Sequence, residues 1–306
     1  MQSAHQVSEL SPLLPYQLQG KIVINPGTEN EKRGSITIYR DHEQSRSELR
    51  VEDYYEVKLV RGNKLYIYRS TPLPVPQLGK LAETDHSWDK LGEDGDARLG
   101  DVSQKKVQSR TANCFDVKGE QKHRLCFDPA KNLLLEIMDQ HRAVEFADYG
   151  DVDGHFFPRK ITVLLELPQQ EKPVLAIEDI QIFKAQFAPS AFAIPPHAVE
   201  FDTCENMVEA KPLQTPTPEF SMNAMRRNAG SPAINVYGII NKEGSLENVK
   251  ILTNDAEVRQ TIMETVSKWR YTPAMCGNSP VATEKEIPVL MFRGGSGQGD
   301  GGRSGR

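Results

Sequence analysis

The residue types that most often carry out catalysis are scattered along this chain. Its seven histidines lie between His5 and His197, and none stands in an H-E-x-x-H frame or a comparable metal-binding frame. No G-x-S-x-G nucleophile motif and no glycine-rich loop suited to a phosphate accompanies them. We therefore expect a protein that is not an enzyme, with no catalytic residue, no metal and no cofactor.

An acidic, glycine-containing stretch, residues 92–101, is the one place where a cation could be considered. Its carboxylates are of the type that Ca²⁺ prefers, but their spacing does not fit the twelve-residue EF-hand loop. The glycines are explained equally well as turn residues, and we interpret the stretch as a loop.

The four cysteines show no C-x-x-C spacing, which argues against a zinc ribbon or a thioredoxin-type site. Cys114 and Cys126 lie at equal distances from Glu120, within a segment that resembles a hairpin, so they could face each other across two strands. They could also be two buried free thiols. For Cys204 and Cys276 a disulfide and free thiols are about equally consistent with the sequence.

Composition excludes several classes of protein. The chain has 306 residues with 37 basic and 42 acidic side chains and a pI near 5.9, so it has no broad positive field to attract nucleic acid. No run approaches the roughly 18 apolar residues of a membrane span. The first residues have neither the basic nor the apolar region of a signal peptide, and we expect any signal peptide or anchor of the natural protein to be missing from this chain.

The clearest structural pattern is residues 144–167, which predicts two long strands joined by a turn. Ile161, Val163 and Leu165 alternate with polar residues, as in a strand buried on one side, and Asp151 to Gly154 supply the turn. Similar short segments recur before and after this pair and predict an antiparallel meander. Its expected strands are 16–25, 34–41, 45–52, 54–60, 64–69, 105–117, 121–127, 132–138 and 174–183.

Within the meander we expect the apolar residues Ile38, Leu49 and Val57 to share one face of the sheet, opposite a charged face. Residues 77–91 have the spacing of one or two short helices that would cover the sheet. After residue 205 the pattern changes to a short helix at 221–228, strands at 233–240 and 246–252, a helix beginning near Asp255, and a strand at 286–292.

This last order, α-β-β-α-β, resembles the C-terminal domain of TonB-like energy transducers over about residues 208–292. The motifs that carry the resemblance are residues 249–252 before the helix, Trp269 to Ala274 after it, and Gly277 to Val281 before the final strand. The Tyr-Pro pair that usually opens the family's helix is replaced here by Pro218 to Ser221. The resemblance implies binding of a protein partner by strand addition to an edge strand. The edge residues would be Ile287, Val289, Met291 and Phe292.

The meander resembles the half-barrel of the LolA/LolB-like lipoprotein-carrier superfamily over about residues 14–196. The resemblance is carried by the segments 126–129, 133–136, 148–158 and 191–195. It implies an incomplete antiparallel barrel with a helical lid around an apolar cavity for acyl chains, in the bacterial periplasm. The cavity would be lined by Ile38, Leu49, Val57, Ile67, Leu134, Ile161, Val163 and Leu165.

Together these patterns predict a mainly β protein with a small α+β domain. The expected segments are a flexible N-terminus (1–13), a half-barrel domain (14–204), a proline-rich linker (205–218), a TonB-like domain (219–292) and a flexible glycine-rich tail (293–306). We expect a periplasmic envelope or transport protein that binds an apolar ligand or lipid and a protein partner. The alternatives are an interaction scaffold without a small ligand, and an energy transducer whose anchor lies outside this chain.

Overall fold

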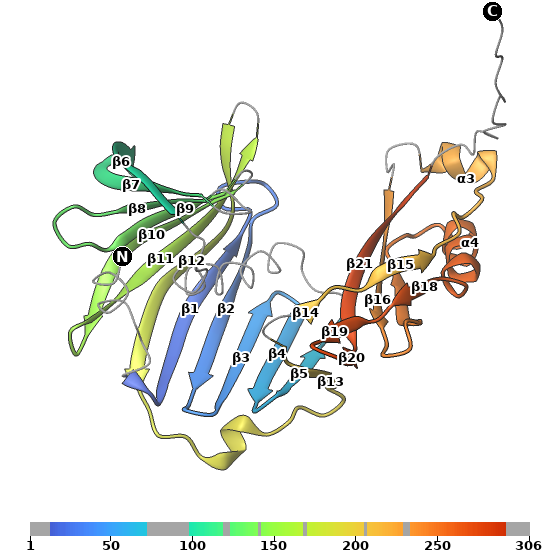
Figure 1. Ribbon diagram of the computed structural model, residues 1–306, viewed down its shortest axis with the longest axis horizontal. Helices are drawn as coiled ribbons and strands as arrows, with labels where there is room; N and C mark the ends of the chain where they lie inside the picture. The colour runs from blue at the N-terminus through green and yellow to red at the C-terminus, as the bar shows by residue number, and fades with distance from the viewer. Residues whose placement is uncertain are drawn as a thin grey trace, which may run out of the picture. The chain divides into compact units, whose positions relative to one another are not determined.

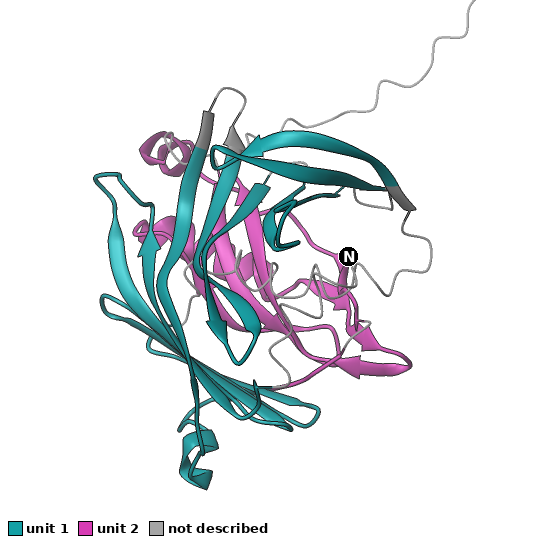
Figure 2. Ribbon diagram, turned by 90° about the vertical axis from the view of Figure 1, so that its left-hand side faces the viewer, with its two compact units in different colours: residues 1–200 teal, residues 201–306 magenta. Residues whose placement is uncertain are grey.

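The computed structural model describes residues 13–71, 98–118, 123–139, 142–167, 170–204, 207–228 and 233–291. The chain forms two compact units, Met1–Glu200 and Phe201–Arg306, shown in separate colours in Figure 2. The predicted helices at 77–91 lie outside the described residues.

Unit 1 is built around one antiparallel sheet of 13 strands in the order β13-β5-β4-β3-β2-β1-β12-β11-β10-β9-β8-β7-β6 (Figure 1). The strands are β1 (Tyr16–Ile24), β2 (Lys32–Arg40), β3 (Gln44–Val51), β4 (Tyr54–Arg61), β5 (Lys64–Arg69), β6 (Arg98–Val107), β7 (Arg110–Lys118), β8 (His123–Phe127), β9 (Leu134–Met138), β10 (Arg142–Val152), β11 (His155–Leu167), β12 (Gln170–Lys184) and β13 (Val199–Asp202). The order is linear, so β6 and β13 are edges and the sheet does not close.

Short turns connect most of the successive strands of this meander. The predicted hairpin of β10 and β11 is confirmed, and its turn is held by Gly154, whose N–H donates to Asp151 Oδ1 at 2.9 Å. One predicted strand, 105–117, is instead a hairpin. Gln108 and Ser109 both have positive φ and turn the chain between β6 and β7. Positive φ is usually adopted by glycine, asparagine or aspartate, and the absence of these residues at 108 and 109 is why the sequence pattern concealed the turn.

The sheet bends where β1 meets β12 (Figure 1). The pairing shifts by one residue between Gln19 and Lys21, and Asp179 takes a positive φ at this bulge. A Cβ atom at Gly20 would lie 2.8 Å from Ile177 Cγ2, so a larger residue would require the Ile177 side chain to move. Bulges increase the local twist of a sheet, and this one lies near the middle of the strand order.

After β12 the chain crosses the sheet as a strap, residues 185–198, that contains the 3₁₀-helix η3 (Pro189–Phe192). Arg46 donates to the carbonyl of Ala193 at 2.9 Å, and Arg61 donates to the carbonyl of Phe192. The Phe192 ring is buried and packs edge-on against Phe187. The strap therefore covers the face to which Arg46 and Arg61 belong.

The described residues of unit 2 form two helices and three small sheets. The helices are α3 (Met222–Arg227) and α4 (Ala256–Val266), and the main sheet has the order β17-β16-β21, with β16 (Ala233–Ile240), β17 (Leu246–Ile251) and β21 (Thr283–Leu290). The short strands are β14 (Met207–Val208), β15 (Lys211–Gln214), β18 (Arg270–Thr272), β19 (Ala274–Cys276) and β20 (Ser279–Val281). The helix and strand order matches the sequence prediction, with β18 to β20 inserted before the last strand.

Helix α4 packs on the main sheet through one apolar stripe. Val258, Ile262 and Val266 are almost completely buried and belong to one core with Val236 of β16. The helix begins at Asp255, whose carboxylate accepts hydrogen bonds from the N–H groups of the first turn. Glu257 in the first turn accepts from the Ser221 hydroxyl at 2.6 Å.

The segment predicted as a linker, 205–218, belongs to unit 2 as far as it is described. Its strands β14 and β15 pair with β19 and β18. Trp269 Nε1 donates to the carbonyl of Pro216 at 2.9 Å, which fixes the proline-rich stretch to the end of α4. The extended conformation favoured by proline is present, but the residues pair within the unit and do not act as a free spacer.

Candidate ligand-binding face

One face of the unit 1 sheet is apolar across most of its width, and we name it the apolar face. Residues directly opposite each other in paired strands point to the same side, so the register identifies its members. One row runs through Ile36 and Leu49, and another joins Val144, Val163 and Leu175. These five belong to a single cluster or pack against it.

A second cluster on the same face extends the apolar surface toward β7. It contains Val117, Leu125, Leu134 and Ile137, and Phe146 of β10 packs against both this cluster and the first one. Phe146 therefore makes the apolar face continuous from β3 to β7. Burial is uneven along it, since some side chains are fully buried and others keep part of their surface exposed.

Seven of the eight predicted lining residues lie on the apolar face. Val163 is fully buried, and Leu49, Ile67 and Leu134 are at least nine-tenths buried. Ile38, Ile161 and Leu165 are only half-buried. The half-buried three are the ones with surface available for an additional contact.

The prediction is wrong for Val57, which lies on the opposite face. The two-residue turn at Glu52 and Asp53 pairs Val51 with Tyr54, and this register places Val57 opposite Glu48. A one-residue shift in register exchanges the two faces of a strand. Hydrophobicity alone suggested that Val57 points inward, but the length of the turn decides the register.

The register of β4 against β3 also places charged residues on the apolar face. Glu56 lies opposite Leu49 and is 7% exposed. Its Oε2 accepts from Arg69 Nε at 2.6 Å and from the Tyr54 hydroxyl at 3.0 Å, while Oε1 lies 3.3 Å from Lys58 Nζ. We name these four residues, Tyr54, Glu56, Lys58 and Arg69, the Glu56 cluster.

The electrostatics of the Glu56 cluster favour the ionised carboxylate. Burial alone would raise the pKa of Glu56, but the charges of Lys58 and Arg69 and the hydrogen bonds outweigh it and hold the pKa below its usual range. Burial of the Tyr54 ring, together with the Glu56 charge, raises the pKa of that phenol well above its usual value. A buried ion pair adds little net stability compared with apolar packing, although removal of one partner is costly.

Sequence reasoning missed the Glu56 cluster, although a signal was present. Tyr54, Glu56 and Lys58 alternate along β4 as regularly as Val57 and Leu59 do. With two alternating sets in one strand, only the pairing to β3 shows which set faces the ligand side.

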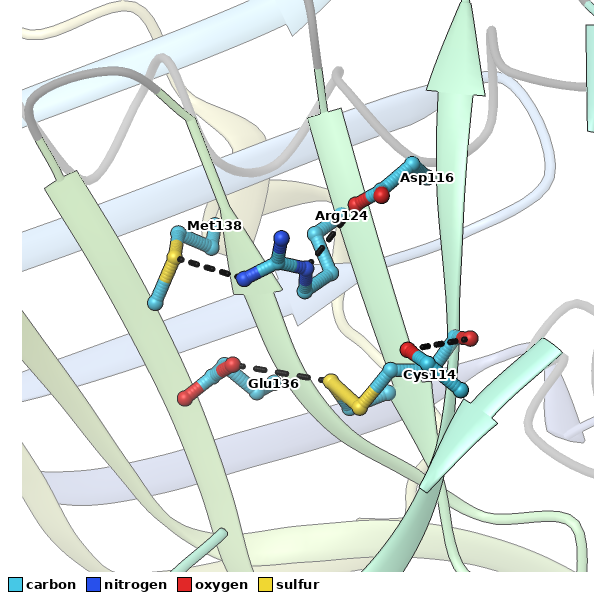
Figure 3. Close-up of a disulfide and its surroundings, with 7 residues drawn as sticks. Cys114, Asp116, Arg124, Glu136 and Met138 are labelled. Carbon is cyan, nitrogen blue, oxygen red and sulfur yellow. Dashed lines mark hydrogen bonds and ion pairs between the residues drawn. A yellow bond between two sulfur atoms is a disulfide. The ribbon is translucent and has the colours of Figure 1, made fainter. Parts of the chain in front are cut away.

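Both candidate pairs of cysteines form disulfides, so the free-thiol alternative is wrong for each. Cys114 and Cys126 lie directly opposite each other in β7 and β8, and their Cα atoms are 4.1 Å apart. The register places this bridge on the face opposite the apolar one. Figure 3 shows the bridge beside Glu136, whose Oε1 lies 3.6 Å from Cys126 Sγ. Beside it, Arg124 Nε donates to Asp116 Oδ1 at 2.9 Å (Figure 3). The bridge fastens neighbouring strands to each other.

The second disulfide, Cys204–Cys276, joins residues 72 positions apart, with their Cα atoms separated by 5.7 Å. It ties the start of unit 2 to β19. The two bridges therefore differ in the length of chain that they close.

The edge of β21 is the predicted partner site, and its geometry differs from the prediction. The Leu252 N–H donates to the Asn235 carbonyl at 3.0 Å, so Asn235 directs its backbone groups toward the β17 side. The next residue, Val236, directs its own toward its partner in β21, Ile287. By the same alternation, Pro288 directs its backbone groups to the free edge.

Three of the predicted edge residues face inward. The Val289 side chain is buried in the unit 2 core, and Ile287 and Met291 pack against that core. Phe292 lies outside the described residues. The outward backbone groups belong to the alternate set, Glu284, Glu286, Pro288 and Leu290.

Two features that would suggest other functions are absent from the described part of the chain. Within the ranges given above, no three His, Cys, Asp or Glu side chains come together in a way that could hold a metal ion. Among the helices of these ranges, none has the length and apolar character needed to cross a membrane.

No protein-family model and no curated protein matches the chain. Solved structures are similar to it at low identity. A LolA superfamily protein from Nitrosomonas europaea is 12% identical with a TM-score of 0.43, and the match covers 63% of this chain and 94% of that one. A DUF1329 family protein from Desulfovibrio piger is 10% identical with a TM-score of 0.41, covering 63% and 95%. MucB, solved in complex with MucA(peri), is 13% identical with a TM-score of 0.24, covering 89% of each chain.

Proposed function

We propose that unit 1 binds an apolar ligand or a lipid acyl chain on its apolar face, and that the protein acts in the bacterial envelope without catalysing a reaction. The observation that carries this proposal is the continuous apolar face, on which Ile38, Ile161 and Leu165 remain half-buried. A protein that used this face only for its own core would gain more by burying these side chains completely. The two disulfides fit an oxidising compartment such as the periplasm.

The test is binding of a neutral apolar probe to the intact chain. Protein purified from the periplasm is extracted with organic solvent and its lipids are identified, and native mass spectrometry measures bound mass. The lipid-free chain is then titrated with N-phenyl-1-naphthylamine, whose fluorescence rises in an apolar site. We expect saturable binding. A chain that carries no lipid and does not bind the probe would leave the scaffold alternative in its place.

We further propose that unit 2 binds an extended segment of a protein partner along β21. Among the strands described, β21 pairs only with β16, and its outward backbone groups could extend the sheet. Pro288 has no N–H, so it removes one donor from that edge without disturbing the pairing to β16. The outward N–H groups on which the proposal rests are those of Glu286 and Leu290.

Substitution by proline tests this edge selectively. Glu286→Pro removes an outward donor, as Pro288 already does, and should abolish strand addition while unit 2 stays folded. A photo-crosslinker at Glu284 reports the partner in the periplasm. We expect an adduct that disappears in the Glu286→Pro variant, and a similar adduct in both proteins would contradict strand addition.

A further inference from the structure

One row of the apolar face combines apolar and polar side chains across four strands. The pairing places Ile38 opposite Ser47, Ser47 opposite Lys58, and Lys58 opposite Ile67. The Cβ atoms of directly opposite residues in neighbouring strands lie about 5 Å apart. The Ser47 and Lys58 side chains therefore begin close to each other on the apolar face, with an isoleucine on either side.

The Lys58 ammonium has capacity for another ligand. Its side chain is 34% exposed and lies 3.3 Å from Glu56, which leaves hydrogen-bond donors available. Arg69 holds the same carboxylate at 2.6 Å and is only 9% exposed. The charge of Glu56 is thus offset by both Lys58 and Arg69, and only Lys58 also keeps a substantial exposed surface. Within the described part of the chain, the Ser47 hydroxyl forms no hydrogen bond.

We propose that Lys58 Nζ and Ser47 Oγ bind the anionic headgroup, a carboxylate or a phosphate, of a single-chain amphiphile whose apolar chain lies along the apolar face. The inference rests on the proposed function of unit 1 and names the class of ligand. A cation beside a hydroxyl is a suitable donor pair for such a headgroup, since charge-assisted hydrogen bonds are the strong ones. The flanking residues Ile38 and Ile67 would contact the first carbons of the chain.

Displacement of a neutral probe distinguishes the contribution of the ligand's headgroup from that of its apolar chain. The intact lipid-free protein is loaded with N-phenyl-1-naphthylamine and titrated with dodecanoate, dodecyl phosphate and dodecanol. Lys58→Gln should weaken displacement by the two anionic compounds about five- to tenfold and leave dodecanol unchanged, as expected for loss of one charge-assisted contact. Ser47→Ala should weaken the anionic compounds about two- to threefold.

Lys160→Gln is the matched control. Lys160 is 42% exposed and lies 3.0 Å from Glu178, much like Lys58 and Glu56, but it is on the opposite face. We expect its curves to match those of the unsubstituted protein. Thermal melting of each variant shows that it is folded.

The remaining outcomes overturn the inference in distinguishable ways. Equal weakening of all three compounds in Lys58→Gln would give Lys58 a structural role only. Competition by inorganic phosphate as strong as that by dodecyl phosphate would mean a site for free phosphate. Failure of the neutral probe to bind the unsubstituted protein would defeat the proposed function itself, whereas probe binding without an anionic effect defeats only the headgroup site.

Discussion

The two units use an apolar sheet face in different ways. In unit 2, helix α4 covers the sheet, and Val258, Ile262 and Val266 have no more than 1% of their surface exposed. In unit 1, the apolar face combines fully buried side chains such as Val163 with half-buried ones such as Ile161. It also contains the Glu56 cluster. The apolar surface of unit 2 is committed to folding, whereas unit 1 retains apolar and charged groups that a ligand can contact.

Removal of the disulfide in unit 2 should have the largest effect on stability. Cys204→Ser with Cys276→Ser opens a loop with a sequence separation of 72, whereas the Cys114 and Cys126 pair closes one of 12. Chain entropy then predicts losses of about 4 and about 3 kcal/mol. Denaturant unfolding followed by Trp269 fluorescence measures the loss of stability on removal of the Cys204–Cys276 bridge. If the shorter bridge proved the more costly, native-state packing and not chain entropy would set the difference.

Truncation of one apolar side chain in each unit should separate effects on stability from effects on ligand binding. Ile262→Ala leaves a cavity under α4 and should cost about 2–5 kcal/mol. Ile161→Ala removes a half-buried side chain, so it should cost less and should weaken binding of the neutral probe. Differential scanning calorimetry with and without the probe measures both effects. Equal destabilisation by the two changes, with unaltered probe binding, would place Ile161 in an ordinary core.

The strands and the helices of unit 2 could be predicted from the sequence because alternation and helical spacing are local patterns. Which face a strand presents depends on register, and register depends on turns. The turn at Glu52 and Asp53 moved Val57 to the opposite face and brought Glu56 onto the apolar one. For the same reason Ile287 faces the core and Pro288 the free edge. The Glu56 cluster also requires Arg69, which comes from another strand.

Larger side chains on the apolar face should distinguish filled sites from sites that are open to a ligand. Val163→Trp places a large ring in a filled site and should cost about 1–3 kcal/mol by overpacking. Ile161 is half-buried, so Ile161→Trp should leave the melting temperature nearly unchanged. The larger ring should block binding of the neutral probe. Melting curves and probe titration distinguish them. A large loss of stability in both variants would mean that the face is packed throughout.

Acid should reveal the smallest difference between the units. In unit 2, hydrogen bonds from Arg227 hold the pKa of Asp255 well below its usual range, and the Ser221 hydroxyl with Arg227 lowers that of Glu257. A folded-state pKa below the unfolded value stabilises the protein above about pH 4, and this contribution is lost as the pH falls through the folded-state pKa. The melting temperature of unit 2 should therefore fall in strong acid.

Asp255→Asn isolates the charge, because asparagine caps a helix as well as aspartate does but does not ionise. The variant should be slightly less stable at pH 7 and show a shallower loss below about pH 4, measured by circular dichroism melts. Glu56→Gln makes the matching change in unit 1, where the lowered pKa of Glu56 acts in the same direction. Glu56→Gln removes the carboxylate charge that buried Arg69 contacts at 2.6 Å, so it should lower stability and also alter binding of anionic amphiphiles, whereas Asp255→Asn should alter stability alone. An Asp255→Asn variant as acid-sensitive as the unsubstituted protein would show that the cap acts by geometry without its charge.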